Sequence, residues 1–129
     1  LVMGIRVLDL EHVAVQVADL ERSIAFYQDT LGLRLRSKDD LSARGLKKAL
    51  LVAGSGIVEL LEYIGKPVPD SDGPIAHIAL RVSDIDGALA ELKTAGVALE
   101  DESPRELEGG IKIAFLRGPD KELIELIQL

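Results

Sequence analysis

The stretch His12-Val-Ala-Val-Gln-Val-Ala-Asp19 recurs with conservative changes as His77-Ile-Ala-Leu-Arg-Val-Ser-Asp84. Further along, Ile57-Val-Glu-Leu-Leu61 recurs as Leu123-Ile-Glu-Leu-Ile127. The chain therefore contains two copies of one plan, and each copy begins with a histidine and ends in a segment that carries a glutamate. A repeat of this length that occurs twice predicts two modules completing one domain, because solenoids usually need three or more units.

The composition agrees with one domain over residues 1–129. An apolar content of 47% with only 3% aromatic residues implies a core of Leu, Ile, Val and Ala. A net charge of −7, spread along the chain, argues against nucleic-acid binding, which needs clustered Lys and Arg. No run reaches the roughly 18 apolar residues of a membrane span. The absence of cysteine excludes disulfides and thiolate chemistry, and a cytoplasmic location is expected.

Each copy is expected to fold as β-α-β-β-β, because its hydrophobic periodicity changes from two to about 3.6 residues. Residues 10–17 alternate as a half-buried strand does, and a helical stripe follows between Asp19, the expected N-cap, and Gly32. Asp84 and Gly96 bound the corresponding helix of the second copy. Further strands are expected at 33–36, 49–53, 57–63, 97–99, 111–116 and 123–129.

The fold class predicted is therefore α+β, with two tandem βαβββ modules. A segment rich in Pro, Asp and Gly at 66–74 is typical of a linker. It separates a first module at 9–65 from a second module at 75–129.

One histidine and one glutamate from each copy are candidate metal ligands. Alternation places His12 and His77 on the strand face opposite the aliphatic row that packs on the helices. Glu59 and Glu125 each stand within an apolar strand, where a bound cation would offset the cost of burying a carboxylate. Because a twofold repeat brings equivalent positions together, we expect one site with two imidazoles and two carboxylates. Such a site suits Zn, Ni, Co, Mn or Fe(II).

Each of these residues also has a structural interpretation. A lone histidine at a strand start is more often a hydrogen-bonded structural residue, and a glutamate in an amphipathic strand can face water. Arg81 and Tyr63 share the face of the proposed groove, where they would contact a substrate or serve as ordinary surface residues. Gly109-Gly110 is expected to be a turn, and residues 100–108 a solvated loop.

Three segments of the chain, which are His12–Gly32, Ala76–Val82 and Gly118–Leu126, resemble the vicinal oxygen chelate superfamily, which includes glyoxalase I. The resemblance covers nearly the whole chain. Members of the superfamily pair two βαβββ modules into a curved mixed sheet around a groove. The groove holds a divalent metal, which is bound by the first and last strands of each module. The resemblance implies the metal ligands His12, Glu59, His77 and Glu125. It also implies a homodimer, with the metal site either within one chain or across the dimer interface.

The resemblance implies a reaction as well. In glyoxalase I a metal stabilises the enediolate that forms when a C–H group next to a carbonyl loses its proton. The last glutamate of the family acts as the base, so Glu125 is the expected base here and Glu59 its partner for returning the proton. The expected function is that of a metal-dependent lyase or isomerase, similar to lactoylglutathione lyase, acting on a small-molecule substrate.

The identity of that substrate stays open at this point. The arginine and asparagine with which glyoxalase I binds glutathione are replaced here by Gln16 and Tyr63. Arg81 occupies the position equivalent to Gln16 in the second copy, from which it would hold an anionic substrate. These three residues are the candidate substrate contacts.

Other members of the superfamily give alternative functions. Residues 109–116 and the Leu-Ile-Glu-Leu ending resemble methylmalonyl-CoA epimerase, although the glutamate expected near Ala43 and a helical insertion are missing. A fourth ligand, Glu59, disfavours an extradiol dioxygenase. A drug-binding module without catalytic activity is disfavoured by the full ligand set and by the few aromatic residues.

Overall fold

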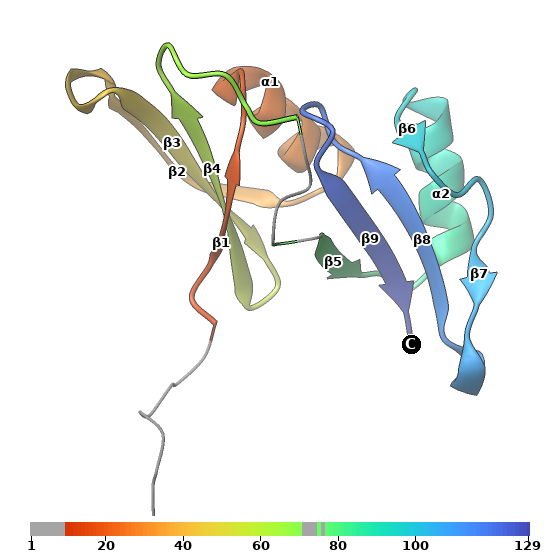
Figure 1. The fold of residues 1–129 in the computed structure, drawn as a ribbon. Coiled ribbons are helices and arrows are strands. Elements are labelled where there is room, and N and C mark those ends of the chain that lie inside the picture. The colour runs from red at the N-terminus through yellow and green to blue at the C-terminus, as the bar shows by residue number, and fades with distance from the viewer. Residues whose placement is uncertain (1–9, 71–74, 76) are drawn as a thin grey trace, which may run out of the picture.

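The computed structural model describes residues 10–70, 75 and 77–129, which form two sheets with a helix against each (Figure 1). The first module comprises β1 (Val13–Gln16), α1 (Leu20–Ala25), the π-helical segment η1 (Phe26–Thr30), β2 (Arg34–Leu41), the 3-10 turn η2 (Ser42–Arg44), β3 (Leu46–Ala53) and β4 (Gly56–Tyr63). The second comprises β5 (Ile78–Arg81), α2 (Ile85–Thr94), β6 (Ala98–Leu99), β7 (Arg105–Glu106), the 3-10 turn η3 (Glu108–Gly110), β8 (Lys112–Arg117) and β9 (Leu123–Gln128).

The two sheets have the same topology, which confirms the α+β class. The strand order is β1-β4-β3-β2 in the first sheet and β5-β9-β8-β6 in the second, where β7 also pairs with β8. In each sheet the first and last strands of the module lie side by side and parallel, whereas the remaining pairs are antiparallel. The strand that follows each histidine therefore lies beside the strand that carries the glutamate.

The helices begin and end at the residues that the sequence indicates. Asp19 accepts a hydrogen bond from the backbone N–H of Arg22 at 3.1 Å, and Asp84 accepts one from Gly87 at 3.0 Å, so both are N-caps. After each helix the chain turns at a glycine with positive φ, 82° at Gly32 and 76° at Gly96. The last turn before Gly32 is π-helical, which was not expected.

A side chain from the last strand of each module also binds the helix N-terminus. The backbone N–H of Leu20 donates to Glu62 Oε1 at 2.7 Å, and that of Ile85 donates to Gln128 Oε1 at 2.8 Å. These acceptors satisfy backbone donors that have no partner within the helix. They fix each helix to the strand that carries the candidate glutamate.

One apolar core fills the space between the sheets and the helices. Its members come from the strand faces opposite the candidate ligands and from the inner helix faces, as alternation predicts. The buried apolar residues are Val17, Leu20, Ile24, Tyr27, Leu33, Ala49, Leu51, Val58, Leu60, Ile85, Leu89, Leu92, Ala114, Leu116, Ile124 and Leu126. The opposite sheet faces are left available to carry the functional side chains.

A partly buried polar junction joins α1 and η1 to the turn between β8 and β9. The Tyr27 hydroxyl is buried and donates to Glu122 Oε2 at 3.0 Å, while Arg22 Nη2 lies 2.7 Å from Asp120 Oδ1. Burial, together with the charge of Glu122, raises the pKa of Tyr27 far above its ordinary value. A Cβ at Gly118 would lie 2.3 Å from Glu122 Cδ, so a larger residue there would have to displace this carboxylate from its contact with Tyr27. The junction sets the two modules in a fixed relation.

Several predicted strand boundaries are wrong. The strand expected at 33–36 extends to Leu41, and its partner begins at Leu46 rather than at residue 49. In this hairpin Asp39 and Asp40 lie opposite Lys48 and Lys47, so charged residues that are typical of a loop are stabilised as cross-strand pairs. The strand expected over 10–17 spans only Val13–Gln16.

The prediction of a solvated loop at 100–108 is also wrong in part. Arg105 and Glu106 form β7, which pairs with β8 opposite Ile113 and Lys112. The expected turn at Gly109-Gly110 is confirmed, because both glycines have positive φ. The expected linker at 66–74 and the start of the first module at residue 9 lie partly outside the described residues. Among the helices that the structure describes, none has the length and apolar character needed to span a membrane.

Candidate metal centre

Each histidine stands immediately before the first strand of its module, and each glutamate lies in the last strand. In the parallel registers, Glu59 lies opposite Ala14 and Glu125 lies opposite Ala79. Alternation therefore puts His12 on the same sheet face as Glu59, and His77 on the same face as Glu125. Val58 and Leu60 are buried on the other face, as are Ile124 and Leu126 in the second sheet.

In the first pair, the imidazole and the carboxylate are too far apart for a direct hydrogen bond. His12 Nε2 lies 3.7 Å from Glu59 Oε1, and the side chains are 39% and 16% exposed. On its other side, His12 Nδ1 lies 2.7 Å from Oε1 of Glu11. In the tautomer with its proton on Nδ1, His12 donates to Glu11 and presents an Nε2 lone pair on the side of Glu59.

The second pair is closer. His77 Nε2 lies 2.9 Å from Glu125 Oε2, and the side chains are 37% and 13% exposed. The imidazole also meets the ring of Phe115 edge to face, with 5.5 Å between centroids and an interplanar angle of 85°. Phe115 lies directly opposite Glu125 in the β8–β9 ladder. Both members of the second pair are therefore beside the same phenyl ring.

The donor types and spacings of the pairs fit a divalent metal. A zinc ion about 2.0–2.2 Å from an imidazole nitrogen and a carboxylate oxygen holds those two atoms roughly 3–3.5 Å apart. The observed separations of 2.9 and 3.7 Å lie on either side of that range. In the tautomer with its proton on Nδ1, each Nε2 carries a lone pair, as the carboxylate oxygen does, so a cation between them would remove their repulsion. Each pair thus offers one nitrogen and one oxygen.

The two pairs do not meet within the chain. In residues 10–70, 75 and 77–129, no three His, Cys, Asp or Glu side chains come close enough to share a metal ion. The four predicted ligands lie instead as one pair per sheet.

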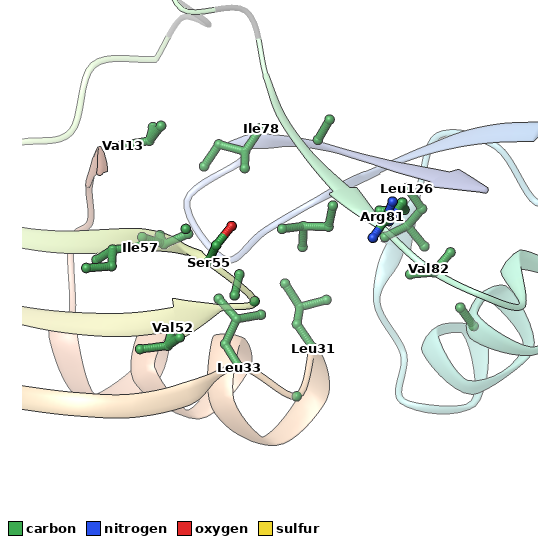
Figure 2. Close-up of a pocket in the computed structure, with 18 of the residues that line it drawn as sticks. Val13, Leu31, Leu33, Val52, Ser55, Ile57, Ile78, Arg81, Val82 and Leu126 are labelled. Atoms are coloured by element: carbon green, nitrogen blue, oxygen red, sulfur yellow. The ribbon is translucent and has the colours of Figure 1, made fainter. Parts of the chain in front are cut away.

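The histidines open into two different cavities, and strands β1 and β5 line both. His12 and Arg81 line a cavity of about 600 Å³, whose walls are mainly aliphatic side chains of both modules, with Ser55 and Arg81 among the few polar ones (Figure 2). His77 and Gln16 line a second cavity of about 810 Å³. Each cavity thus combines the histidine of one module with a candidate substrate contact of the other.

The three candidate substrate contacts do not converge on one point. Gln16 Nε2 donates to the carbonyl oxygen of Pro67 at 3.4 Å, whereas Arg81 is exposed and lines the other cavity. Tyr63 is half-buried, and the ammonium group of Lys66 lies 5.7 Å from its ring centroid. Of the three, Arg81 lines the cavity of His12, and Gln16 lines the cavity of His77.

Four residues next to the pairs were missed by the sequence reasoning. Glu11 precedes His12 directly, so its contact with the imidazole could have been expected from adjacency. Phe115 lies opposite Glu125 in the β8–β9 register, so pairing the two expected strands would have pointed to it. It is also one of only two phenylalanines in the sequence. Arg105 and Asp101, which contact Phe115, lie in a segment where no local pattern indicates such a contact.

Comparison with known proteins shows the family. Residues 9–126 match the model of the Glyoxalase/Bleomycin resistance protein/Dioxygenase superfamily. The chain belongs to this superfamily.

Named relatives include two kinds of enzyme. The chain is 32% identical over 123 residues to a probable lactoylglutathione lyase of Synechocystis, which covers 92% of this chain and 94% of the relative. It is 30% identical over 128 residues to human mitochondrial methylmalonyl-CoA epimerase, covering 92% and 73%. Among solved structures, a trypanothione-dependent glyoxalase I of Leishmania major superposes with a TM-score of 0.76 at 30% identity, covering 91% and 84%. At the level of the family, the chain is glyoxalase-like.

Proposed function

We propose that this protein is a metal-dependent lyase or isomerase that removes a proton next to a carbonyl group, as expected of a glyoxalase I-like enzyme. The observation that carries this proposal is the repeated pair, in which an imidazole Nε2 faces a glutamate carboxylate at equivalent positions of both sheets. We infer in addition that modules at 9–65 and 75–129 form a single domain.

The site would be completed by a second copy of the chain. Because the two pairs lie apart in one chain, His12 and Glu59 of one copy would join His77 and Glu125 of the other. A homodimer of this kind holds two equivalent sites, each with two nitrogen and two oxygen ligands. This ligand set suits Zn, Ni, Co, Mn or Fe(II).

The residues have distinct roles in this proposal. A divalent metal at this site would supply a Lewis acid that stabilises the negative charge developing on the substrate oxygen. Glu125, only 13% exposed, would take the proton from carbon, and Glu59 would return it to the neighbouring carbon. His12 and His77 would hold their positions throughout, while Arg81, Gln16 and Tyr63 would contact the small-molecule substrate.

The test is metal analysis combined with an activity assay. Purified protein should contain about one divalent metal ion per chain by elemental analysis and should have the mass of a dimer by light scattering. It should convert the methylglyoxal–glutathione hemithioacetal, and a chelator should abolish that turnover. Protein that binds no metal after reconstitution would contradict the proposal.

Methylmalonyl-CoA epimerisation is the second candidate, and the similarity to the human epimerase favours it. The same two carboxylates would then exchange a proton on opposite faces of one carbon. A metal-loaded dimer that does not convert the hemithioacetal but epimerises methylmalonyl-CoA would show that this reaction is the correct one. A drug-binding module would instead be free of metal and bind an aromatic drug.

A further inference from the structure

We propose that Asp101, Arg105 and Phe115 form a clamp that holds the His77 imidazole in the orientation that binds metal. The inference rests on the proposed metal site and adds three positioning residues to it. None of the three is a ligand, and none belongs to the repeat that identifies the ligands.

The clamp begins with the phenyl ring. Phe115 is half-buried on the ligand face of the second sheet, opposite Glu125, and meets the His77 ring at 5.5 Å between centroids. The Arg105 guanidinium lies over the Phe115 ring, with Cζ 5.4 Å from the centroid, a distance typical of a cation–π contact. The phenyl ring thus contacts both a guanidinium and the His77 imidazole.

Asp101 connects the Arg105 guanidinium to the backbone of Phe115. Its Oδ2 accepts from Arg105 Nη2 at 3.1 Å and from the backbone N–H of Phe115 at 2.9 Å. The backbone N–H groups of Glu100 and Asp101 donate in turn to the Phe115 carbonyl, at 2.9 and 3.2 Å. The side chain of Asp101 is only 19% exposed. One carboxylate oxygen therefore fixes both the main chain and the stacked cation at Phe115.

The contacts of Asp101 with Phe115 lie where the edge of the second sheet is interrupted between β6 and β7. β6 pairs with β8 up to Leu116, and β7 pairs with it from Ile113. Between them Phe115 has no strand partner on that side, and Asp101 supplies the acceptor that a strand would supply. The chain is then free to leave the sheet at 102–104 and return with Arg105 above the phenyl ring.

Among its described residues, 10–65, the first module has no such clamp. Leu50 occupies the place opposite Glu59 that Phe115 occupies opposite Glu125. His12 instead contacts Glu11, whose side chain is 76% exposed, and its distance to Glu59 is longer. The second pair is therefore preorganised, so it would bind the metal more tightly than the first, because less side-chain freedom is lost on binding.

The metal-free protein provides a direct test. The chain has two histidines, so NMR of the imidazole C–H groups gives two sets of signals, which His12→Ala assigns. We expect Phe115→Leu, which places in β8 the residue type found at Leu50, to shift the His77 signals and leave those of His12 unchanged. Arg105→Gln should shift the His77 signals less. The matched control is Lys93→Gln, an exposed charge on α2, which should shift neither set.

Metal affinity is the second readout, measured on the full-length protein by competition for Co²⁺ with a chromophoric chelator. Phe115→Leu should weaken binding about 10–100-fold, as loss of residues that orient a ligand does. Arg105→Gln should weaken it by up to about tenfold. Arg105→Lys should weaken it less than Arg105→Gln does, because an ammonium group also binds an aromatic face. Lys93→Gln should have no effect.

A double-mutant cycle separates positioning from general damage to the fold. If the clamp acts through His77, Phe115→Leu should have little further effect on Co²⁺ affinity when His77 is already alanine. An equal loss in both backgrounds would overturn the inference, as would unchanged His77 signals in metal-free Phe115→Leu. Wild-type protein that binds no Co²⁺ would refute the proposed metal site. The His77 signals of metal-free Arg105→Gln, which keeps the phenyl ring and its ring current, would still decide whether the clamp holds His77.

Discussion

His77 and Glu125 lie 2.9 Å apart beside a phenyl ring, whereas His12 and Glu59 lie 3.7 Å apart beside an exposed carboxylate. The two pairs occupy equivalent positions of two parallel ladders, so the strand register does not cause this difference. It comes from neighbours that the repeat does not share, namely Phe115 in one module and Glu11 in the other. The repeat thus places a histidine opposite a glutamate in each module. Neighbouring residues that differ between the modules determine how firmly each histidine is held.

The sheet edges differ for a related reason. In the first sheet β2 and β3 form a long hairpin, in which two aspartates face two lysines at its far end. In the second sheet the corresponding edge is divided into β6 and β7, with Asp101 bonded to β8 between them. The continuous edge extends the sheet, whereas the interrupted edge brings a guanidinium close to the phenyl ring beside His77.

The largest expected effect concerns the glutamates. Glu125→Gln should lower kcat by about 10²–10⁴-fold, because a buried amide cannot accept the proton from carbon. The fold should persist, since the amide has nearly the same shape. Turnover of the hemithioacetal, metal content and far-UV circular dichroism would be measured together, with Glu59→Gln as the matched variant of the other pair. Full activity of Glu125→Gln would show that this carboxylate is not the base.

The next prediction compares the two histidines. Because the second pair is closer and better supported, His77→Ala should lower metal affinity at least about tenfold more than His12→Ala does. Competition with a chelator measures both affinities, and thermal unfolding checks that each variant folds. Equal losses would show that the difference between the pairs disappears once the metal is bound.

A smaller effect is expected at the junction that joins the modules. Tyr27→Phe removes the hydroxyl that donates to Oε2 of the partly buried Glu122 and should cost about 1–3 kcal/mol of the free energy of unfolding. Tyr63→Phe, on a half-buried tyrosine, is the control and should change stability little. Urea denaturation measures both. An unchanged stability of Tyr27→Phe would show that water replaces the hydroxyl.

The same tyrosine predicts a dependence of stability on pH. Burial raises the pKa of Tyr27 in the folded state, so its contribution to stability is fully present below the pKa of unfolded tyrosine, about 10. It should decline as the pH rises above that value toward the folded-state pKa. Stability measured between neutral pH and pH 11 should therefore fall less steeply in Tyr27→Phe than in the wild type, and parallel curves would contradict this assignment.

The smallest effect is expected at Glu11. Glu11→Gln weakens the acceptor for His12 Nδ1, but the side chain is 76% exposed and water can replace it. We expect a loss of metal affinity below about tenfold, at the weak end of what residues supporting a ligand contribute. A loss as large as that of Phe115→Leu would mean that the first pair is supported as firmly as the second.

Much of this organisation could be predicted from the sequence, because it depends on local patterns. Alternation put the candidate ligands on the face away from the core, and the burial of Leu60 and Ile124 agrees with it. The N-caps Asp19 and Asp84 were predicted correctly because capping involves residues only three positions apart. The length of the β2–β3 hairpin was not, because its charged pairs form only across two strands.

The sequence by itself determined the two modules, their α+β fold class and the candidate metal ligands, since each depends on short-range periodicity and on the repeat. Only the tertiary structure decided that the two pairs lie apart in one chain, that they open into different cavities, and that one of them is held by Phe115 and Arg105. These features depend on contacts between segments far apart in the chain, such as Tyr27 with Glu122. The repeat says that both modules are alike, but it does not contain the contacts that orient one module against the other.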